Sequence, residues 1–432
     1  MSTPAVAAEG NKPAQSMGVL SVSAIGIGAM VGAGIFALIG QAALVAGQKV
    51  WMSFLLGGVI ALLSGYSFAR LSTRYASADG ALGYFNAAFS KRVAGTFSLI
   101  YVLTLLVAVA MVARAFGAYA ERLFFDISSH GVLIDVFAAG IIVAMAILNM
   151  VSEGATGWVE MVLVGIKLVI LSALTVAGIA TFDPAMLAPH MAVSTKTMFG
   201  AIGLTFFAYA GYGTMANAGA AVENPGRTIS TAIFLAIGMT IVLYVGLSLV
   251  LLGNVSPADL AKYADTAVAQ AAKPIFGQIG FTMVSIAALL ATASAINGTL
   301  FGALRIAGGM AKNGQFPDAF NVHVWRNWTG GILACILGVI ALAVAFNLSV
   351  IASAASVAFL VAYLGVHLAA WRLAPEIGAN RAVVGLGMVS MLAVLVVFVQ
   401  GLWETQPSAV WTAAAVVVGS ILVQVALARE RR

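Results

Sequence analysis

The sequence predicts an all-α integral membrane protein with twelve transmembrane helices. Its 432 residues are 62% hydrophobic and only 8% charged, whereas about one quarter of the residues in a soluble domain are charged. The mean hydropathy is +1.05, and the apolar residues form long runs. Each run has the roughly 20 residues that a 30 Å hydrocarbon layer requires. The twelve runs cover residues 18–46, 51–69, 93–120, 132–150, 158–181, 199–221, 231–253, 276–303, 330–346, 350–371, 383–402 and 408–428.

Basic residues are distributed unevenly between the twelve segments. If both termini lie on one side, fourteen Lys and Arg residues fall on that side and five on the other. The positive-inside rule then predicts that both termini are cytoplasmic. The fourteen are Lys12, Arg70, Arg74, Lys91, Arg92, Arg227, Arg305, Lys312, Arg326, Arg372, Arg381, Arg429, Arg431 and Arg432, and the five are Lys49, Arg122, Lys196, Lys262 and Lys273.

Glycines lie near the middle of the first and sixth segments. The stretch GAMVGAGIFALIG covers residues 28–40, and the sixth segment contains Gly203, Gly211, Gly213 and Gly219. Helices interrupted at matching positions indicate two inverted repeats with a substrate site between them. Close helix packing is the alternative reason for such glycines.

Four motifs resemble the amino acid, polyamine and organocation transporter superfamily. They are GAMVGAGIF in the first segment, RLSTRYASADGALGYFNAAFS after the second, FFAYAGYG with VENPGRTIS at the sixth, and RIAGGMAKNGQFPDAF after the eighth. The motifs occur in the order typical of that family, between residues 28 and 320. Each motif is weakly specific alone, but together they are fairly specific.

The resemblance implies a LeuT-like fold, with a five-plus-five inverted repeat and broken helices 1 and 6. Residues 17–372 would form this ten-helix transport core and residues 383–428 two accessory transmembrane helices, between a cytoplasmic tail at 1–16 and a short cytoplasmic end at 429–432. Half-helix ends supply N–H groups for a carboxylate and carbonyls for an ammonium group. By motif, the implied substrate-binding residues are Met30, Gly32, Ala33, Gly34, Ile35, Phe207, Ala210, Gly211 and Tyr212.

Acidic residues are absent from the middle of every predicted segment. In some relatives that handle basic substrates, the position of Gly213 carries an acidic residue. A dicationic polyamine would therefore lack a counter-ion in an apolar site. The sequence favours a neutral amino acid over a polyamine or other organic amine.

Lys167 lies near the middle of the fifth segment. A central lysine is costly in a bilayer, and desolvation favours its neutral form. The resemblance implies that it occupies the place of the sodium ion of sodium-coupled relatives, with Thr292 and Ser294 as polar neighbours. Two interpretations stay open: Lys167 exchanges a proton during transport, or it is a fixed cation that holds helices together.

Taken together, these features predict a secondary active amino acid transporter, or permease, of the cell inner or plasma membrane. We expect sodium-independent transport by alternating access, with proton symport or with exchange as an antiporter. The alternatives are a polyamine or organic amine transporter of the same superfamily and, from another class, a membrane nutrient sensor. The expected partners are a small-molecule substrate, protons and the lipid bilayer, with no nucleic acid. No clustered titratable groups or metal-ligand spacing indicate an enzyme, a metal or a cofactor.

Overall fold

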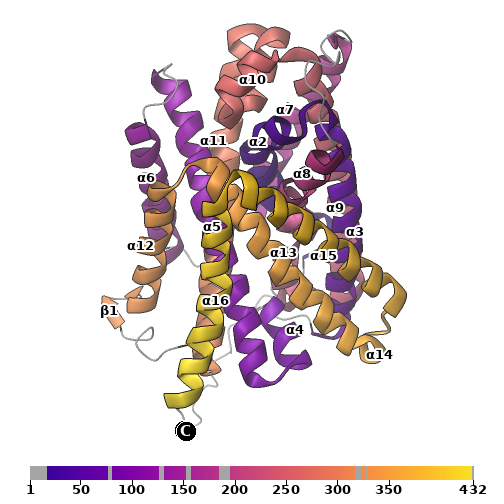
Figure 1. Cartoon of the computed structure of the whole chain (residues 1–432), viewed down its shortest axis with the longest axis vertical. Helices are drawn as coiled ribbons and strands as arrows, with labels where there is room; N and C mark the ends of the chain where they lie inside the picture. The colour runs from indigo at the N-terminus through magenta and orange to yellow at the C-terminus, as the bar shows by residue number, and fades with distance from the viewer. Residues whose placement is uncertain are drawn as a thin grey trace, which may run out of the picture.

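The structure is a computed structural model of the chain. It describes residues 17–75, 80–125, 131–151, 157–183, 195–316, 323–325 and 328–430. The predicted tail at residues 1–16 and the last two residues of the predicted end at 429–432 lie outside the described residues. Within the described part, the chain is a bundle of long helices (Figure 1).

The first half of the chain contains eight α-helices and three short helices of other kinds. They are α1 (Val19–Met30), η1 (Val31–Ile35), α2 (Phe36–Ala46), η2 (Gly47–Lys49), α3 (Val50–Tyr75), α4 (Ala81–Ala88), α5 (Lys91–Phe125), α6 (Gly131–Val151), α7 (Gly157–Ala180), α8 (Thr195–Tyr209) and η4 (Ala210–Ala221).

The second half adds eight α-helices, one short 3-10 helix and a small hairpin. They are α9 (Pro225–Asn254), α10 (Pro257–Tyr263), η5 (Ala264–Thr266), α11 (Ala267–Lys312), β1 (His323–Trp325), β2 (Trp328–Thr329), α12 (Gly330–Ala345), α13 (Leu348–Arg372), α14 (Ala374–Ile377), α15 (Arg381–Thr405) and α16 (Pro407–Glu430). The antiparallel pair β1 and β2 was not expected from the sequence.

Every one of the predicted apolar segments overlaps helical structure. Nine helices among the described residues are long and apolar enough to cross a membrane. The first, sixth and ninth predicted spans do not form such helices over their whole length. The first and sixth segments are interrupted, and α12, in the ninth, has only 16 residues. The chain is therefore a multi-pass helical membrane protein, while the number twelve and the inverted repeat stay predictions.

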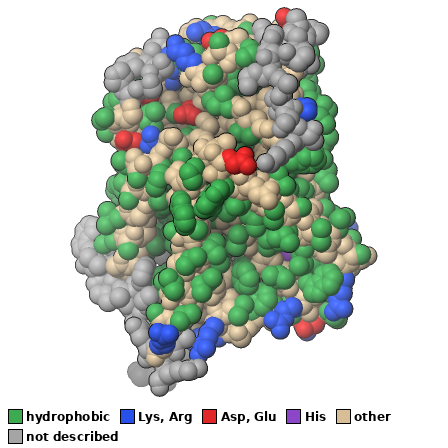
Figure 2. All heavy atoms as spheres, viewed as in Figure 1, with side chains coloured by type: hydrophobic (Ala, Val, Ile, Leu, Met, Phe, Trp, Pro, Cys, Tyr) green, Lys and Arg blue, Asp and Glu red, His purple; other side chains and the backbone are tan. Residues whose placement is uncertain are grey.

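Central and peripheral helices differ in how much of their surface the protein covers. In α5, 83% of the most apolar stretch is buried within the protein, but in α6 only 17% is. The central helix α5 packs against α6, α11, α13 and α16, and α3 packs against α8 and α9. Hydrophobic side chains dominate the middle of the face in Figure 2, and Lys and Arg side chains gather toward its ends. This pattern fits a bundle surrounded by lipid.

The first segment is interrupted at its glycines by a turn of π-helix. Val31–Ile35 form η1, and the backbone is in the right-handed helical region at both of its ends, at Met30 and Val31 and at Ile35 and Phe36. This is milder than the two separate half-helices expected from the sequence. In the sixth segment, α8 ends at Tyr209 and a 12-residue 3-10 helix, η4, follows. Long 3-10 stretches and π turns are uncommon, and they often mark hinges or functional sites.

Tyrosine hydroxyl groups from neighbouring helices bond to the carbonyl groups at both interruptions. Tyr244 of α9 donates to the carbonyl of Met30 at 2.7 Å and to that of Ala208 at 3.2 Å. Tyr363 of α13 donates to the carbonyl of Ala210. A change in helix type leaves carbonyls without their usual partners, and a membrane interior offers no water to replace them. These tyrosines therefore stabilise both interruptions.

We expect Tyr244→Phe to lower stability, because it leaves two buried carbonyls without this hydroxyl donor. An unsatisfied buried group costs about 1–3 kcal/mol, so the melting temperature of the purified protein in detergent should fall measurably. The matched control is Tyr75→Phe, which removes a hydrogen bond to Glu376 at the protein surface. Equal melting temperatures for the two variants would contradict the role assigned to Tyr244.

Candidate functional site

A small cavity lies beside the interruption in the sixth segment. Its volume is about 30 Å³. The lining comes from six elements, α1, α5, α8, η4, α11 and α13, and none of the lining residues is exposed. The lining residues are Ala29, Tyr101, Leu105, Ala108, Phe207, Ala208, Ala210, Gly211, Thr214, Thr299 and Phe359.

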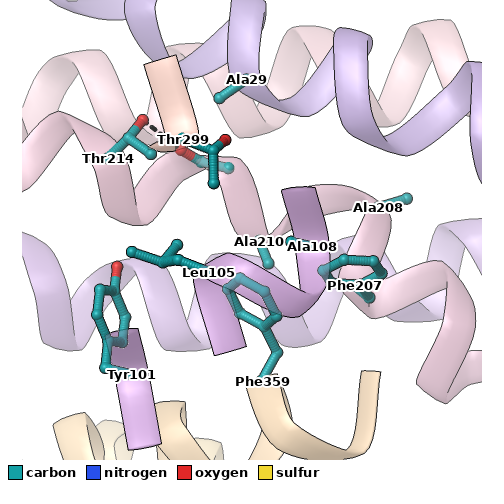
Figure 3. A pocket seen from close by; sticks show the side chains of 11 residues that line it. Ala29, Tyr101, Leu105, Ala108, Phe207, Ala208, Ala210, Thr214, Thr299 and Phe359 are labelled. Carbon is teal, nitrogen blue, oxygen red and sulfur yellow. Dashed lines mark hydrogen bonds between the residues drawn. The ribbon is translucent and has the colours of Figure 1, made fainter. Parts of the chain in front are cut away.

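The cavity lining carries no Asp, Glu, Lys, Arg or His side chain among the described residues. Its polar groups are the hydroxyls of Thr214, Thr299 and Tyr101, together with backbone groups. The Thr214 hydroxyl donates to the carbonyl of Gly211 at 2.7 Å. Figure 3 shows Thr214 near Thr299, and the rings of Phe207 and Phe359 beside each other. The centroids of those two rings are 4.9 Å apart. The cavity thus combines an apolar, aromatic wall with a few hydroxyl groups.

Glycines allow the interrupted helices to approach each other and α11. A Cβ atom added to Gly32 would lie 2.7 Å from Cβ of Ala295 in α11. One added to Gly34 would lie 2.6 Å from the hydroxyl oxygen of Tyr244, and one added to Gly211 would lie 2.8 Å from the backbone of Ala29. Such distances are far below ordinary contact, so these positions accept only glycine without movement. Close packing, the alternative considered from the sequence, is therefore one role of these glycines.

The structure brings some of the predicted substrate-binding residues to the cavity and leaves others beside it. Phe207, Ala210 and Gly211 line the cavity, whereas Met30 follows the lining residue Ala29. The π turn η1 contains Gly32, Gly34 and Ile35. It also contains the backbone of Ala33, whose side chain lies outside the described residues.

Tyr212 lies in a different aromatic cluster. Its ring packs at 5.5 Å from that of Phe68 and at 5.5 Å from that of Tyr363. It is fully buried there, and it is not among the cavity-lining residues. Of the two aromatic residues predicted for the substrate site, Phe207 lines the cavity and Tyr212 does not.

Lys167 is buried in α7, with 2% of its surface exposed. Its helix packs against α1, α9 and α11. Thr292 of α11 is fully buried, and its hydroxyl donates to the carbonyl of Ala288 in the same helix at 2.6 Å. Ser294 is half-buried on α11. The helix that carries Lys167 thus contacts the interrupted first segment and α11, the two regions named for Lys167 from the sequence, and it contacts α9 as well.

Sequence reasoning missed the contributions of α5, α11 and α13 to the cavity. Tyr101, Thr299 and Phe359 occur in apolar runs where rings and hydroxyls are ordinary packing residues. Thr214 carried a usable signal, because it directly follows the motif FFAYAGYG and is polar within an interrupted segment.

Gly213, the position that carries an acidic residue in some relatives, lies beside two tyrosine hydroxyl groups. A Cβ atom added to Gly213 would be 2.8 Å from the hydroxyl oxygen of Tyr101 and would also contact the hydroxyl oxygen of Tyr363.

Three relatives show what kind of protein this chain is similar to. It is 43% identical to the inner membrane transport protein YbaT of Escherichia coli (strain K12), over 97% of both chains. It is 26% identical to the methylthioribose transporter of Bacillus subtilis (strain 168), over 74% of both chains. It is also 26% identical to cationic amino acid transporter 9, chloroplastic, of Arabidopsis thaliana, over 72% of this chain and 58% of that one.

The match to a known family extends over nearly the whole chain. The family model described as amino acid permease matches residues 17–426. That range begins in front of α1 and includes both interruptions, the cavity and most of α16. The chain therefore belongs to the amino acid permease family of the amino acid, polyamine and organocation superfamily, and it is a membrane transporter rather than an enzyme.

Proposed function

We propose that this protein is a sodium-independent permease for small neutral amino acids, which works by alternating access with proton symport or exchange. The observation that carries this proposal is the uncharged cavity beside the two helix interruptions. The relatives do not decide the substrate, because one is named for methylthioribose and another for cationic amino acids. The substrate class proposed here therefore rests on the cavity of this chain.

The lining favours a substrate whose side chain is neutral. A buried charge needs a partner, because its transfer from water into an apolar site is costly. The atoms nearest to a side chain at Gly213 would be the hydroxyls of Tyr101 and Tyr363, not a carboxylate. An arginine side chain, or the second ammonium group of a diamine, would meet uncharged groups among the described lining residues and no carboxylate.

The size of the cavity favours a small substrate. One water molecule needs roughly 10–15 Å³, so the 30 Å³ cavity has room for about two waters. Even a small amino acid requires the lining helices to move apart. Phe207 and Phe359 then limit how large a side chain can be accepted.

The interruptions can bind both charged ends of an amino acid. The carbonyls of Met30 and Ala210 each accept from a tyrosine hydroxyl. A carbonyl oxygen has two lone pairs, so each can also accept from an ammonium group. The N–H groups of Gly32, Ala33, Gly34 and Ile35 would bind the carboxylate once the π turn opens. Because these contacts use the backbone, they do not require an arginine.

Lys167 is our candidate for the coupling residue. Two observations support this choice: Lys167 is buried, and its helix α7 packs against α1, α9 and α11. Proton exchange at Lys167 would couple transport to the proton gradient. In the alternative, Lys167 is permanently charged and holds α7, α1 and α11 together, and transport takes place by exchange of substrates.

The substrate class is tested by uptake into sodium-free proteoliposomes. We expect accumulation of labelled glycine, alanine or serine, and little uptake of phenylalanine, arginine or a diamine. An imposed inward proton gradient distinguishes symport from exchange, because exchange requires internal substrate. Uptake restricted to arginine and the diamine would overturn the neutral substrate, and saturable binding without any transport would indicate a sensor.

The coupling residue is tested with Lys167→Ala. We expect this variant to lose gradient-driven accumulation and the pH dependence of uptake. The reason is that the first and eighth segments contain no ionisable side chain that could replace Lys167. The matched control is Lys262→Ala, an exposed lysine of α10. Unchanged pH dependence in Lys167→Ala, at a melting temperature equal to that of the control, would rule out coupling at this residue.

The size limit is tested with Phe359→Ala, which enlarges the cavity. One extra methylene is worth about 1–3 kcal/mol of discrimination, so the ratio of Vmax/KM for leucine to that for alanine should rise about tenfold or more. Phe276→Ala is the control, because Phe276 is 46% exposed and does not line the cavity. No change in that ratio would show that Phe359 does not limit substrate size.

A further inference from the structure

A second and larger cavity lies on the outside of the bundle. Both α12 and α16 pack against α5, while the described residues of α12 and α16 do not pack extensively against each other. The result is a groove with α5 as its floor, hereafter the α5/α12/α16 groove, with a volume of about 400 Å³. Its lining includes Leu99, Leu106, Cys335, Gly338, Gly419 and Val423.

The groove is apolar and opens to the outer surface of the bundle. Its floor residues Leu99 and Leu106 are buried, whereas Gly338 of α12 and Val423 of α16 are exposed. Its volume is in the range of about 300–1,000 Å³ found for small-molecule sites. The helices α5 and α16 are both long and apolar enough to span the membrane. A surface opening at this level faces hydrocarbon, so the available occupant is an acyl chain.

Polar and basic residues follow the groove lining along α5 and α16, beyond one end of the groove. Gln424 of α16 donates to the carbonyl of Gln315 at 2.7 Å, and its side chain lies against Gly95 of α5. Arg92 is three residues before Gly95, and Arg429 is five residues after Gln424. Both arginines are exposed.

The spacing along α5 suits a lipid headgroup at these arginines. With 1.5 Å per helical residue, Arg92 lies roughly 10 Å beyond Leu99, where the apolar lining ends. The headgroup layer of one leaflet is roughly 5–8 Å thick, and an arginine side chain can extend along it. Figure 2 shows Lys and Arg side chains at the lower end of the molecule, the end at which α16 terminates in Figure 1.

We propose that the α5/α12/α16 groove binds one acyl chain of an anionic phospholipid, with its headgroup against Arg92 and Arg429. The apolar walls would hold the chain, and the two cations would select the charge of the headgroup. This site is separate from the cavity between the interrupted helices, so the proposal does not depend on the transported substrate.

The groove can be filled without disturbing the bundle. A Cβ atom at Gly338 meets nothing within 4 Å, and the same is true of Gly140 in α6, which does not line the groove. We therefore expect Gly338→Phe to retain about fivefold less added phosphatidylglycerol than the unchanged protein in native mass spectrometry, because its ring takes the place of the acyl chain. Gly140→Phe should retain as much as the unchanged protein.

Equal retention by Gly338→Phe and Gly140→Phe would overturn the proposal. So would a dimer that dissociates only in Gly338→Phe, because a second copy of the chain would then be the occupant. The unchanged protein provides a further measurement, because Cys335 is its only cysteine and lines the groove. Added phosphatidylglycerol should slow alkylation of Cys335 by N-ethylmaleimide, and an unaffected rate would count against the acyl chain.

The charge selection is tested by combining Arg92→Gln with Arg429→Gln. A basic residue near an anionic membrane contributes about 1 kcal/mol, or about fivefold, to binding. We expect the double variant to lose most of the preference for phosphatidylglycerol over phosphatidylcholine that the unchanged protein shows. Arg381→Gln, at the start of α15, is the matched control and should keep that preference. Equal retention of both lipids by the unchanged protein would overturn an anionic ligand.

Discussion

Backbone hydrogen bonding inside a membrane is the constraint on which this structure depends. The hydrocarbon interior contains no water, so a carbonyl group that leaves the regular helical pattern must find another donor within the protein. At the interrupted first and sixth segments, Tyr244 and Tyr363 supply that donor from α9 and α13. These helices must lie close to the interruptions, and their positions fix the middle of the bundle.

Glycine and tyrosine have complementary parts in this arrangement. Gly32, Gly34 and Gly211 remove side chains where backbones meet, and the tyrosine hydroxyls then reach carbonyls that bulkier residues would cover. The small cavity lies at the same level, because the change of helix type leaves irregular space there. Among the described residues, no charged side chain lines the cavity, and Lys167 lies on α7, which packs against α1, α9 and α11.

Hydropathy predicted the helices well, because an apolar run in a bilayer has to satisfy its backbone as a helix. It could not predict the form of the interruption at Val31–Ile35. Glycines permit both unwinding and close packing, and the choice depends on Ala295 and Tyr244, which are far away in the sequence. For the same reason, the motif around Phe207 located one wall of the cavity, but Tyr101 and Phe359 were found only once the helices were assembled.

The hydroxyl of Tyr244 has a consequence for how the two interrupted segments communicate. It carries a single proton, yet it lies within bonding distance of carbonyls from both segments, at 2.7 Å from that of Met30 and 3.2 Å from that of Ala208. The two carbonyls therefore compete for one donor. If the first segment moves away, the proton becomes fully available to the sixth, and the reverse also holds. A movement of either interrupted segment therefore changes the hydrogen bonding of the other through this one phenol group.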